Sequence, residues 1–204
     1  MTTNLPDIYF IRHGQTDWNA QGRYQGQQDI ALNEVGREQA FSNGRLLRGL
    51  LNEAGLNGND MDWYVSPLSR AIDTMEIIRS NFTDLDKKPI IDKSLIEVSF
   101  GEFEGSLHTD ILSSFEKRGE RSEKFWDFRP KNGESYVDLL DRVEPFISTI
   151  KKPSIIVSHG GTARVFRYLI EGISKIQAVN LETPQDAILY FSKGKLSIVE
   201  GETG

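Results

Sequence analysis

The sequence of 204 residues contains no cysteine, which excludes disulfide bonds, thiolate nucleophiles and thiolate metal sites. No apolar run approaches the roughly 20 residues that a membrane span needs. The first residues, Met-Thr-Thr-Asn, lack the basic and apolar regions of a secretion signal. The net charge of -6 leaves no broad basic surface for nucleic acid or anionic lipid. We therefore expect a cytoplasmic protein with no nucleic-acid partner and no membrane partner.

Histidine is also scarce, and two of the three histidines stand in matched contexts. An apolar run over residues 8–11 leads into Arg12-His13-Gly14, and a second run over residues 154–157 leads into Ser158-His159-Gly160. Both runs have the length and composition of buried strands, and the glycine after each histidine favours an immediate turn. The pattern predicts two histidines that are presented at strand ends.

A third apolar segment, residues 61–65, leads through Ser-Pro-Leu-Ser into Arg70, in the first turn of an expected helix. In an open α/β sheet, ligands bind outside the carboxyl ends of the strands. If the three strands are parallel neighbours, His13, His159, Arg12 and Arg70 share one pocket. Arginine matches phosphate oxygens in a bidentate way, and a neutral imidazole can attack phosphorus, so this pocket indicates phosphate chemistry.

The alternation of strands and helices predicts an α/β fold, a three-layer sandwich whose central sheet is mainly parallel and flanked by helices. The length favours a single domain over residues 1–204. We expect helices over residues 33–54, 68–82, 135–150 and 162–170, with Pro145 kinking or splitting the third. Residues 88–91 are expected to form an edge strand and residues 187–199 a terminal hairpin, whereas residues 15–26 have no period and are expected to be a loop.

Residues 106–132 are mixed in charge, and we expect them to form an excursion over the active site. Their basic residues are Lys117, Arg118, Arg121, Lys124 and Arg129, and their large aromatic residues are Phe115, Phe125, Trp126 and Phe128. The aromatic set is more typical of a local core than of a substrate lid. His108 is expected to be a solvated or capping residue.

These pieces, in this order, resemble the histidine phosphatase superfamily, also called the phosphoglycerate mutase-like family. The resemblance covers nearly the whole chain and depends on Arg12-His13-Gly14, the loop through Asn19, residues 23–26 and 32–36, Ser66 to Ala71, Leu95-Ile96-Glu97 and Ser158-His159-Gly160. It implies the phosphoglycerate mutase-like fold and a metal-independent reaction without a cofactor, acting on a small phosphorylated substrate. A homodimer is compatible with the sequence.

Carried over residue by residue, the resemblance implies that His13 is the nucleophile and becomes phosphohistidine. Arg12, Arg70 and His159 would bind the transferring phosphoryl group. Glu97 would protonate the leaving oxygen and then activate water. Asn19, Gln25 and the backbone of Gly160 would contact the phosphoryl group.

Mutases and phosphatases of this family share the same centre, and two features favour a phosphatase. In the mutases the glutamate is followed by an Arg-x-Tyr-Gly pattern and a basic insertion, and the second His-Gly is followed by asparagine. Here Glu97 is followed by Val98-Ser99-Phe100, and His159-Gly160 by Gly161. Val98 stands where many relatives of both kinds carry arginine, which makes the substrate side of the pocket less basic.

Other interpretations remain open at this stage. Two histidines can form part of a metal site, although no nearby carboxylate has ligand spacing. Glu104 competes with Glu97 for the role of proton donor, and Asn19 and Gln25 could be ordinary turn residues. The two alternatives to a phosphatase are a phosphoglycerate mutase that depends on a phosphorylated cofactor and a non-catalytic module that binds phosphorylated ligands.

Overall fold

A computed structural model describes residues 5–117 and 125–201, apart from the side chains of residues 112 and 114–117. Its centre is a six-stranded sheet with the order β3-β2-β4-β1-β5-β6. β1, β2, β3 and β4 are parallel, whereas β5 pairs antiparallel with β1 and β6 antiparallel with β5. The strands are β1 (Ile8–Arg12), β2 (Asp62–Val65), β3 (Ile90–Ile91), β4 (Ser154–Ser158), β5 (Ala187–Ser192) and β6 (Lys195–Glu200).

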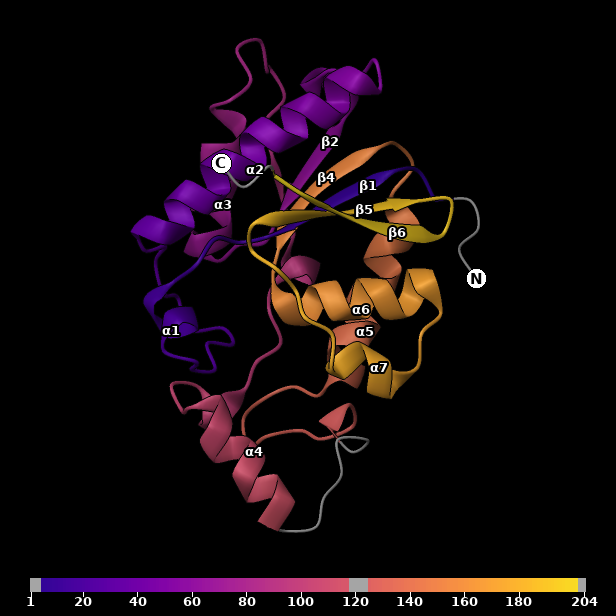
Figure 1. Ribbon diagram of the computed structural model, residues 1–204. Coiled ribbons are helices and arrows are strands. Elements are labelled where there is room, and N and C mark those ends of the chain that lie inside the picture. The colour runs from indigo at the N-terminus through magenta and orange to yellow at the C-terminus, as the bar shows by residue number, and fades with distance from the viewer. Residues whose placement is uncertain (1–4, 118–124, 202–204) are drawn as a thin grey trace.

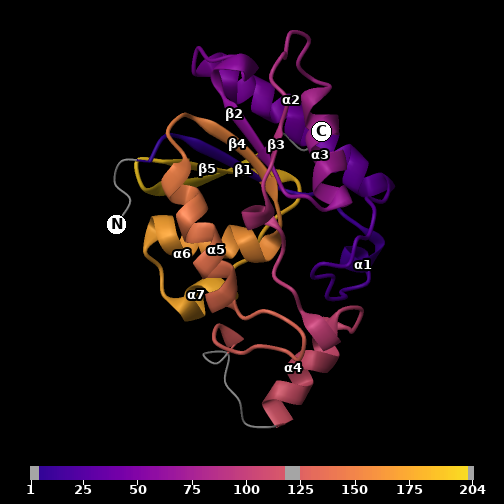
Figure 2. The same cartoon turned by 180° about the vertical axis from the view of Figure 1, so that it is seen from behind.

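Helices cover both faces of this sheet (Figures 1 and 2), which confirms the expected α/β sandwich. One face carries α5 and α6, with α7 beside α6, and the opposite face carries α2 and α3. The helices are α1 (Asp17–Ala20), α2 (Glu34–Glu53), α3 (Ser69–Arg79), α4 (His108–Lys117), α5 (Tyr136–Thr149), α6 (Gly160–Glu171) and α7 (Lys175–Val179). Short 3-10 turns span Gly58–Asp60, Lys93–Leu95 and Gly101–Phe103. None of the helices in the described part of the chain is long and apolar enough to cross a membrane.

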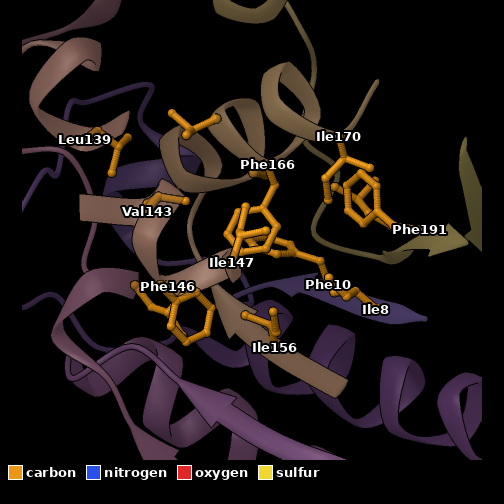
Figure 3. Close-up of a cluster of buried hydrophobic side chains, with 14 of the residues drawn as sticks. Ile8, Phe10, Leu139, Val143, Phe146, Ile147, Ile156, Phe166, Ile170 and Phe191 are labelled. Carbon is orange, nitrogen blue, oxygen red and sulfur yellow. The ribbon is translucent and has the colours of Figure 1, made fainter. Parts of the chain in front are cut away.

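The central strands are continuously apolar because both of their faces are buried. Successive side chains of a strand point to opposite faces. Ile8 and Phe10 of β1 therefore enter the cluster under α5 and α6, whereas Tyr9 and Ile11 enter the cluster under α2 and α3. Figure 3 shows the first cluster, in which Phe166 of α6 lies close to Phe10, with ring centroids 5.0 Å apart.

Most of the expected elements are present, and the differences have local causes. The residues at 15–26 contain the short helix α1, because Thr16 and Asn19 form a reciprocal capping box that the hydrophobic pattern does not reveal. α6 begins two residues before the expected start, with His159 as its N-cap. Pro145 lies inside α5, which continues unbroken from Tyr136 to Thr149, so the proline does not split the helix.

The excursion at residues 106–132 contains α4, which lies apart from the sheet in both views, and α1 lies on the same side (Figures 1 and 2). Trp126 is fully buried and belongs to the main core, as expected for a local core residue. Its ring packs against Tyr136 of α5 and Tyr168 of α6, with centroid distances of 5.3 and 4.8 Å. The expectations for Arg118, Arg121, Lys124 and the side chains of Phe115 and Lys117 lie outside the described residues.

Candidate active site

The candidate site forms where three parallel strands end together. In the register of the sheet, Arg12 of β1 lies opposite Ser158 of β4, and Val65 of β2 lies opposite Val157 of β4. His13 and His159 therefore follow directly after neighbouring strands, and their rings lie 5.1 Å apart between centroids. The carboxyl ends of the parallel strands bring together the side chains that the sequence pattern predicted to converge.

His13 is held in one tautomer and is buried. Its Nδ1 lies 2.7 Å from the carbonyl oxygen of Gly14, and Arg70 Nε donates to its Nε2 over 3.2 Å. The proton therefore sits on Nδ1, and the electron pair of the unprotonated Nε2 accepts the hydrogen bond from Arg70. Burial, followed by the charges of Arg70 and Arg12, lowers the pKa of His13 well below its ordinary value. The imidazole is thus neutral at pH 7, as a nucleophile must be.

A close backbone approach fixes the turn after His13. A Cβ atom on Gly14 would lie 2.1 Å from the carbonyl oxygen of Gly36, at the start of α2. Only glycine fits between these two backbones. The Gly14 N–H also donates to Thr74 Oγ1 at 3.0 Å, which ties the turn to α3.

His159 is completely buried and is not among the residues that line the cavity. Its Nε2 lies 2.6 Å from Ser66 Oγ, and its Nδ1 has no hydrogen-bond partner among the described residues. Burial and the charge of Arg70 lower the pKa of His159 well below its ordinary value. The sequence suggested direct contact with a phosphoryl group. That contact stays a prediction, and the structure shows Nδ1 of His159 as an unpaired buried nitrogen.

Arg70 and Arg12 approach His13 from two elements, α3 and β1. Arg70, in the first turn of α3, donates from its terminal nitrogens to the carbonyls of Gln28 and Gly26 at 2.8 and 2.7 Å. Arg12 donates to the carbonyl of Thr183 at 2.7 Å, whereas its buried Nε has no partner among the described residues. Burial lowers the pKa of Arg12 to about 10, so the guanidinium stays charged at neutral pH. The unpaired Arg12 Nε is a hydrogen-bond donor of the kind that binds an anion.

Glu97 lies on the opposite wall, held by the N-terminus of α6. Its two carboxylate oxygens accept N–H groups of Val98 and Gly161 at 2.9 and 3.0 Å. A Cβ atom on Gly161 would lie 2.4 Å from Glu97 Oε1. Glycine after the second His-Gly is therefore what allows Glu97 to occupy this place.

The peptide of Glu97 is fixed as firmly as its carboxylate. Arg142 and Gln27 both donate to the Glu97 carbonyl at 3.0 Å, and Ser158 Oγ donates to the carbonyl of Leu95 at 2.7 Å. These contacts come from α5, the loop after α1 and the end of β4. The proposed proton donor is thus positioned by groups from distant parts of the sequence.

Glu104, the competing carboxylate, has a different environment. Its Oε1 accepts the N–H groups of Gln27 and Phe100, both at 3.1 Å, and the hydroxyl of Ser99 at 3.2 Å. Glu104 joins two loops and does not line the cavity, whereas Glu97 does. The geometry therefore favours Glu97 over Glu104 as the carboxylate that contacts a ligand.

The three remaining predicted residues all border the cavity. Asn19 Oδ1 accepts from Gln185 Nε2 at 3.1 Å, and Gln25 Oε1 accepts from Thr16 Oγ1 at 2.9 Å. Gly160 leaves room for Thr183, whose Oγ1 would lie 2.9 Å from an added Cβ, and Arg12 Nε lies at ordinary contact distance. Asn19 and Gln25 are therefore held by the fold and also face the space where a ligand would lie.

These residues surround a cavity of about 520 Å³. Part of its wall was not predicted from the sequence, namely Arg23, Tyr24, Phe100, His108, Phe125, Tyr136, Arg164, Val179, Asn180 and Thr183. Arg23 and Tyr24 belong to residues 23–26, on which the family resemblance depends, and His108 and Phe125 belong to the expected excursion. Arg164 carried a further signal, since it stands one helical turn after Gly160. His108 is exposed, as expected, and its ring also packs against the edge of Tyr24 at 4.2 Å.

Burial raises the pKa of Tyr24 to about 12, so its hydroxyl stays protonated over the physiological range. Among residues 5–117 and 125–201, no group of three or more histidine and acidic side chains has an arrangement that could hold a metal ion.

The fold and the site together define an α/β protein with an arginine-flanked histidine at the carboxyl ends of parallel strands. The family model of the histidine phosphatase superfamily (branch 1) matches residues 8–200, and the chain belongs to this superfamily. Its known members named below are mutases and phosphatases.

Two similar curated proteins are 2,3-bisphosphoglycerate-dependent phosphoglycerate mutases. The Bartonella henselae protein is 28% identical and is covered over 96% of both chains. The Bartonella bacilliformis protein is 30% identical over 84% of both chains. Among solved structures, a mycobacterial glucosyl-3-phosphoglycerate phosphatase has a TM-score of 0.77 at 23% identity, over 97% of this chain and all of that one. This last likeness shows a shared fold.

Proposed function

We propose that this protein is a phosphatase that hydrolyses a phosphomonoester through a covalent phosphohistidine at Nε2 of His13. The observation that carries the proposal is the state of His13. Its Nδ1 proton is engaged by Gly14, its Nε2 is unprotonated, and Arg70 Nε lies 3.2 Å from that atom. A buried neutral imidazole flanked by two arginines is suited to attack phosphorus.

In the first step, His13 Nε2 forms a bond to phosphorus while the bond between phosphorus and the leaving oxygen breaks. Glu97, in its protonated form, gives its proton to that oxygen, and the alcohol departs. Arg70 and the unpaired Nε of Arg12 bind the equatorial oxygens, whose charge rises in the transition state. Nδ1 of His159 is the second unpaired nitrogen of the candidate site, and we assign it to the same oxygens.

In the second step, water attacks the phosphohistidine. Glu97 accepts a proton from this water, the P–N bond breaks, and His13 regains its electron pair as inorganic phosphate leaves. Asn19, Gln25 and the Gly160 backbone border the same space and complete the phosphoryl site. Both reaction steps use only the substrate, water and groups of this protein.

A phosphoglycerate mutase is the second candidate, because similar curated proteins carry that name. The two functions differ in whether phosphohistidine transfers its phosphoryl group to water or to a substrate hydroxyl. Gly161, where the mutases of the family carry asparagine, supports the phosphatase, since a side chain there would displace Glu97. The structural neighbour that is named a phosphatase, solved with VO3, supports it as well.

The test is phosphorus NMR of the purified protein with a panel of phosphomonoesters. The panel includes p-nitrophenyl phosphate and 3-phosphoglycerate with a trace of 2,3-bisphosphoglycerate. We expect inorganic phosphate to accumulate. Interconversion of 3- and 2-phosphoglycerate without phosphate release would identify a mutase, and an unchanged spectrum with folded protein would favour a binding module.

The covalent step is tested by the His13→Ala variant. Loss of the nucleophile should lower kcat by at least about 10³-fold, with an unchanged circular dichroism spectrum. Acid-labile radioactive phosphate should be trapped on the wild-type protein during turnover and should be absent from the variant. A variant that keeps more than a few percent of wild-type activity would exclude the phosphohistidine mechanism.

A further inference from the structure

Arg164 lines the cavity but has no role in the proposed phosphoryl transfer. It lies on α6, four residues after Gly160, which corresponds to about 6 Å along the helix axis. Gly160 packs against Arg12. Arg164 is therefore one helical turn away from the phosphoryl site, on the same face of α6.

The guanidinium of Arg164 is fixed but is not neutralised. Nε donates to the carbonyl of Leu181 at 3.0 Å, and Nη1 donates to the hydroxyl of Tyr136 at 3.1 Å. Within the described part of the chain, Nη2 forms no hydrogen bond and no carboxylate lies within ion-pair distance of Arg164. The contact with Tyr136 raises the pKa of Arg164, so the side chain stays charged. A positioned guanidinium with an open edge is suited to bind an oxyanion.

The charges around the cavity show that a phosphoryl group alone does not balance it. Four arginines line it, and Glu97 is its one acidic residue, so the wall has an excess of three positive charges when Glu97 is ionised and of four when it carries the proton for the leaving oxygen. The imidazole of His13, which lines the cavity, and that of the buried His159 have lowered pKa values and are neutral. A phosphate ester contributes about -1.5 to -2 at pH 7. At least one positive charge therefore stays uncompensated when a simple phosphomonoester is bound.

The surroundings of Arg164 make that residual charge costly. Phe125, Tyr136 and Val179 form the nearby wall of the cavity and replace water with apolar surface. In such surroundings an ion pair is stronger than in water, and an unpaired charge is less stable. A substrate that supplies a negative group at this point should bind better than one that supplies a hydroxyl.

We infer that Arg164 is a specificity-determining residue that binds a second acidic group of the substrate, a carboxylate or a second phosphate. The substrate class is then a small phosphomonoester that carries another acid within about one helical turn of its phosphoryl group. This inference rests on the proposed function for the orientation of the substrate. The inference identifies the acidic group of the substrate that is recognised at the other end of the same cavity.

The experiment compares two primary alkyl phosphates, whose leaving oxygens are of the same kind. 3-Phosphoglycerate and glycerol 3-phosphate differ in a carboxylate against a hydroxymethyl group. The ratio of their kcat/KM values should be at least about tenfold in favour of the acid for the wild-type protein, which equals about 1.4 kcal/mol. Arg164→Met should reduce this ratio to within about twofold of one. Because a ratio is measured, any general loss of phosphoryl transfer cancels.

The matched control is Arg167→Met, on the same helix. Arg167 pairs with Glu171 at 2.6 Å and does not line the cavity, yet its removal changes the net charge by the same amount. The control should keep the wild-type ratio. Arg164→Lys, which keeps the charge and is the milder change if the methionine variant does not fold, should keep part of the preference. Glycerol 1,3-bisphosphate in place of 3-phosphoglycerate shows whether phosphate or carboxylate is preferred.

A wild-type ratio near one, or an equal loss of the ratio in the Arg164 and Arg167 variants, would overturn the inference while leaving a phosphatase intact. If the wild-type protein hydrolyses no ester, the proposed function fails. The role of Arg164 is then tested by measuring ligand binding. Calorimetric Kd values of the same two compounds for the His13→Ala protein should then differ about tenfold, and the difference should vanish when Arg164→Met is added. Equal Kd values would refute the role of Arg164.

Discussion

The cavity has two ends, the phosphoryl end around His13 and the outer end around Arg164, and these are built in different ways. At the phosphoryl end, His13, Arg70 and Glu97 are each held by hydrogen bonds from several elements, and little freedom is left to their side chains. At the outer end, Phe125 and Tyr136 belong to an aromatic cluster that is centred on Trp126, and Arg164 presents an open edge. The difference indicates that polar contacts fix the positions of the side chains at the phosphoryl end, whereas core packing determines the shape of the outer end.

The largest expected effect concerns Glu97 at the phosphoryl end. Glu97→Gln should reduce kcat on an alkyl phosphate by about 10²–10³-fold, because the leaving alkoxide needs a proton. With p-nitrophenyl phosphate, whose leaving oxygen hardly needs protonation, the loss should stay below about tenfold. Steady-state rates on the two substrates give this comparison.

The control for that variant is Glu104→Gln, which weakens the contact between two loops without touching the cavity. It should affect both substrates to the same extent. A dependence on the leaving group that appears with Glu104 and not with Glu97 would transfer the acid role to Glu104.

The next effect concerns the outer end, where Trp126 anchors the excursion to α5 and α6. Trp126→Ala should lower the free energy of unfolding by about 3–5 kcal/mol, because a fully buried ring is removed. The kcat on p-nitrophenyl phosphate should change less than about threefold while the protein is folded. Urea denaturation and enzyme assays test both parts.

Phe41→Ala on α2 is the matched control for Trp126, since the ring of Phe41 is 50% exposed. It should change the free energy of unfolding by less than about 0.5 kcal/mol. If the two substitutions cost the same, or if Trp126→Ala removes activity on every substrate alike, the two ends of the cavity are not independent.

The smallest effect is the dependence of stability on pH. His13 and His159 have lowered pKa values in the folded state, so the unfolded chain binds protons that the folded chain does not. Stability is therefore complete above the unfolded pKa near 6.5 and falls as the pH drops below it. The slope should approach about 1.4 kcal/mol per pH unit for each histidine. Urea denaturation between pH 7.5 and 5.5, without phosphate, measures it.

His159→Asn should reduce this slope by about half. Removing one of the two buried imidazoles removes its share of the proton uptake on unfolding. A free energy of unfolding that stays constant from pH 7.5 to 5.5 in the wild-type protein would contradict the neutral state assigned to the pair.

Much of the phosphoryl end could be predicted from sequence, because it is built from short segments. Arg12-His13 and His159 each follow an apolar strand, and the rule that parallel strands end at the same edge brings them together. The same local signals predicted the strands and the helices α2, α3, α5 and α6, whereas α1, α4 and α7 were not predicted. The caps at Asn33 and Ser135 begin α2 and α5 at residues where the pattern placed helix starts.

The outer end could not be predicted, because its residues share no local pattern. Tyr24, Phe125, Tyr136, Arg164 and Thr183 come from five separate segments, and each would be an ordinary surface or core residue by itself. The placement of Glu97 against Gly161 also depends on a contact between residues 64 positions apart. Such contacts depend on how helices and loops pack on the sheet.

The sequence by itself determined that two histidines and two arginines gather at one edge of a parallel sheet, since strand periodicity and chain direction are local properties. Tertiary structure alone decided which carboxylate faces them, that His159 is buried outside the cavity wall, and that none of the described carboxylates lies within ion-pair distance of Arg164. The physical reason is that burial and charge pairing are set by residues distant in the chain, whose positions no local pattern contains.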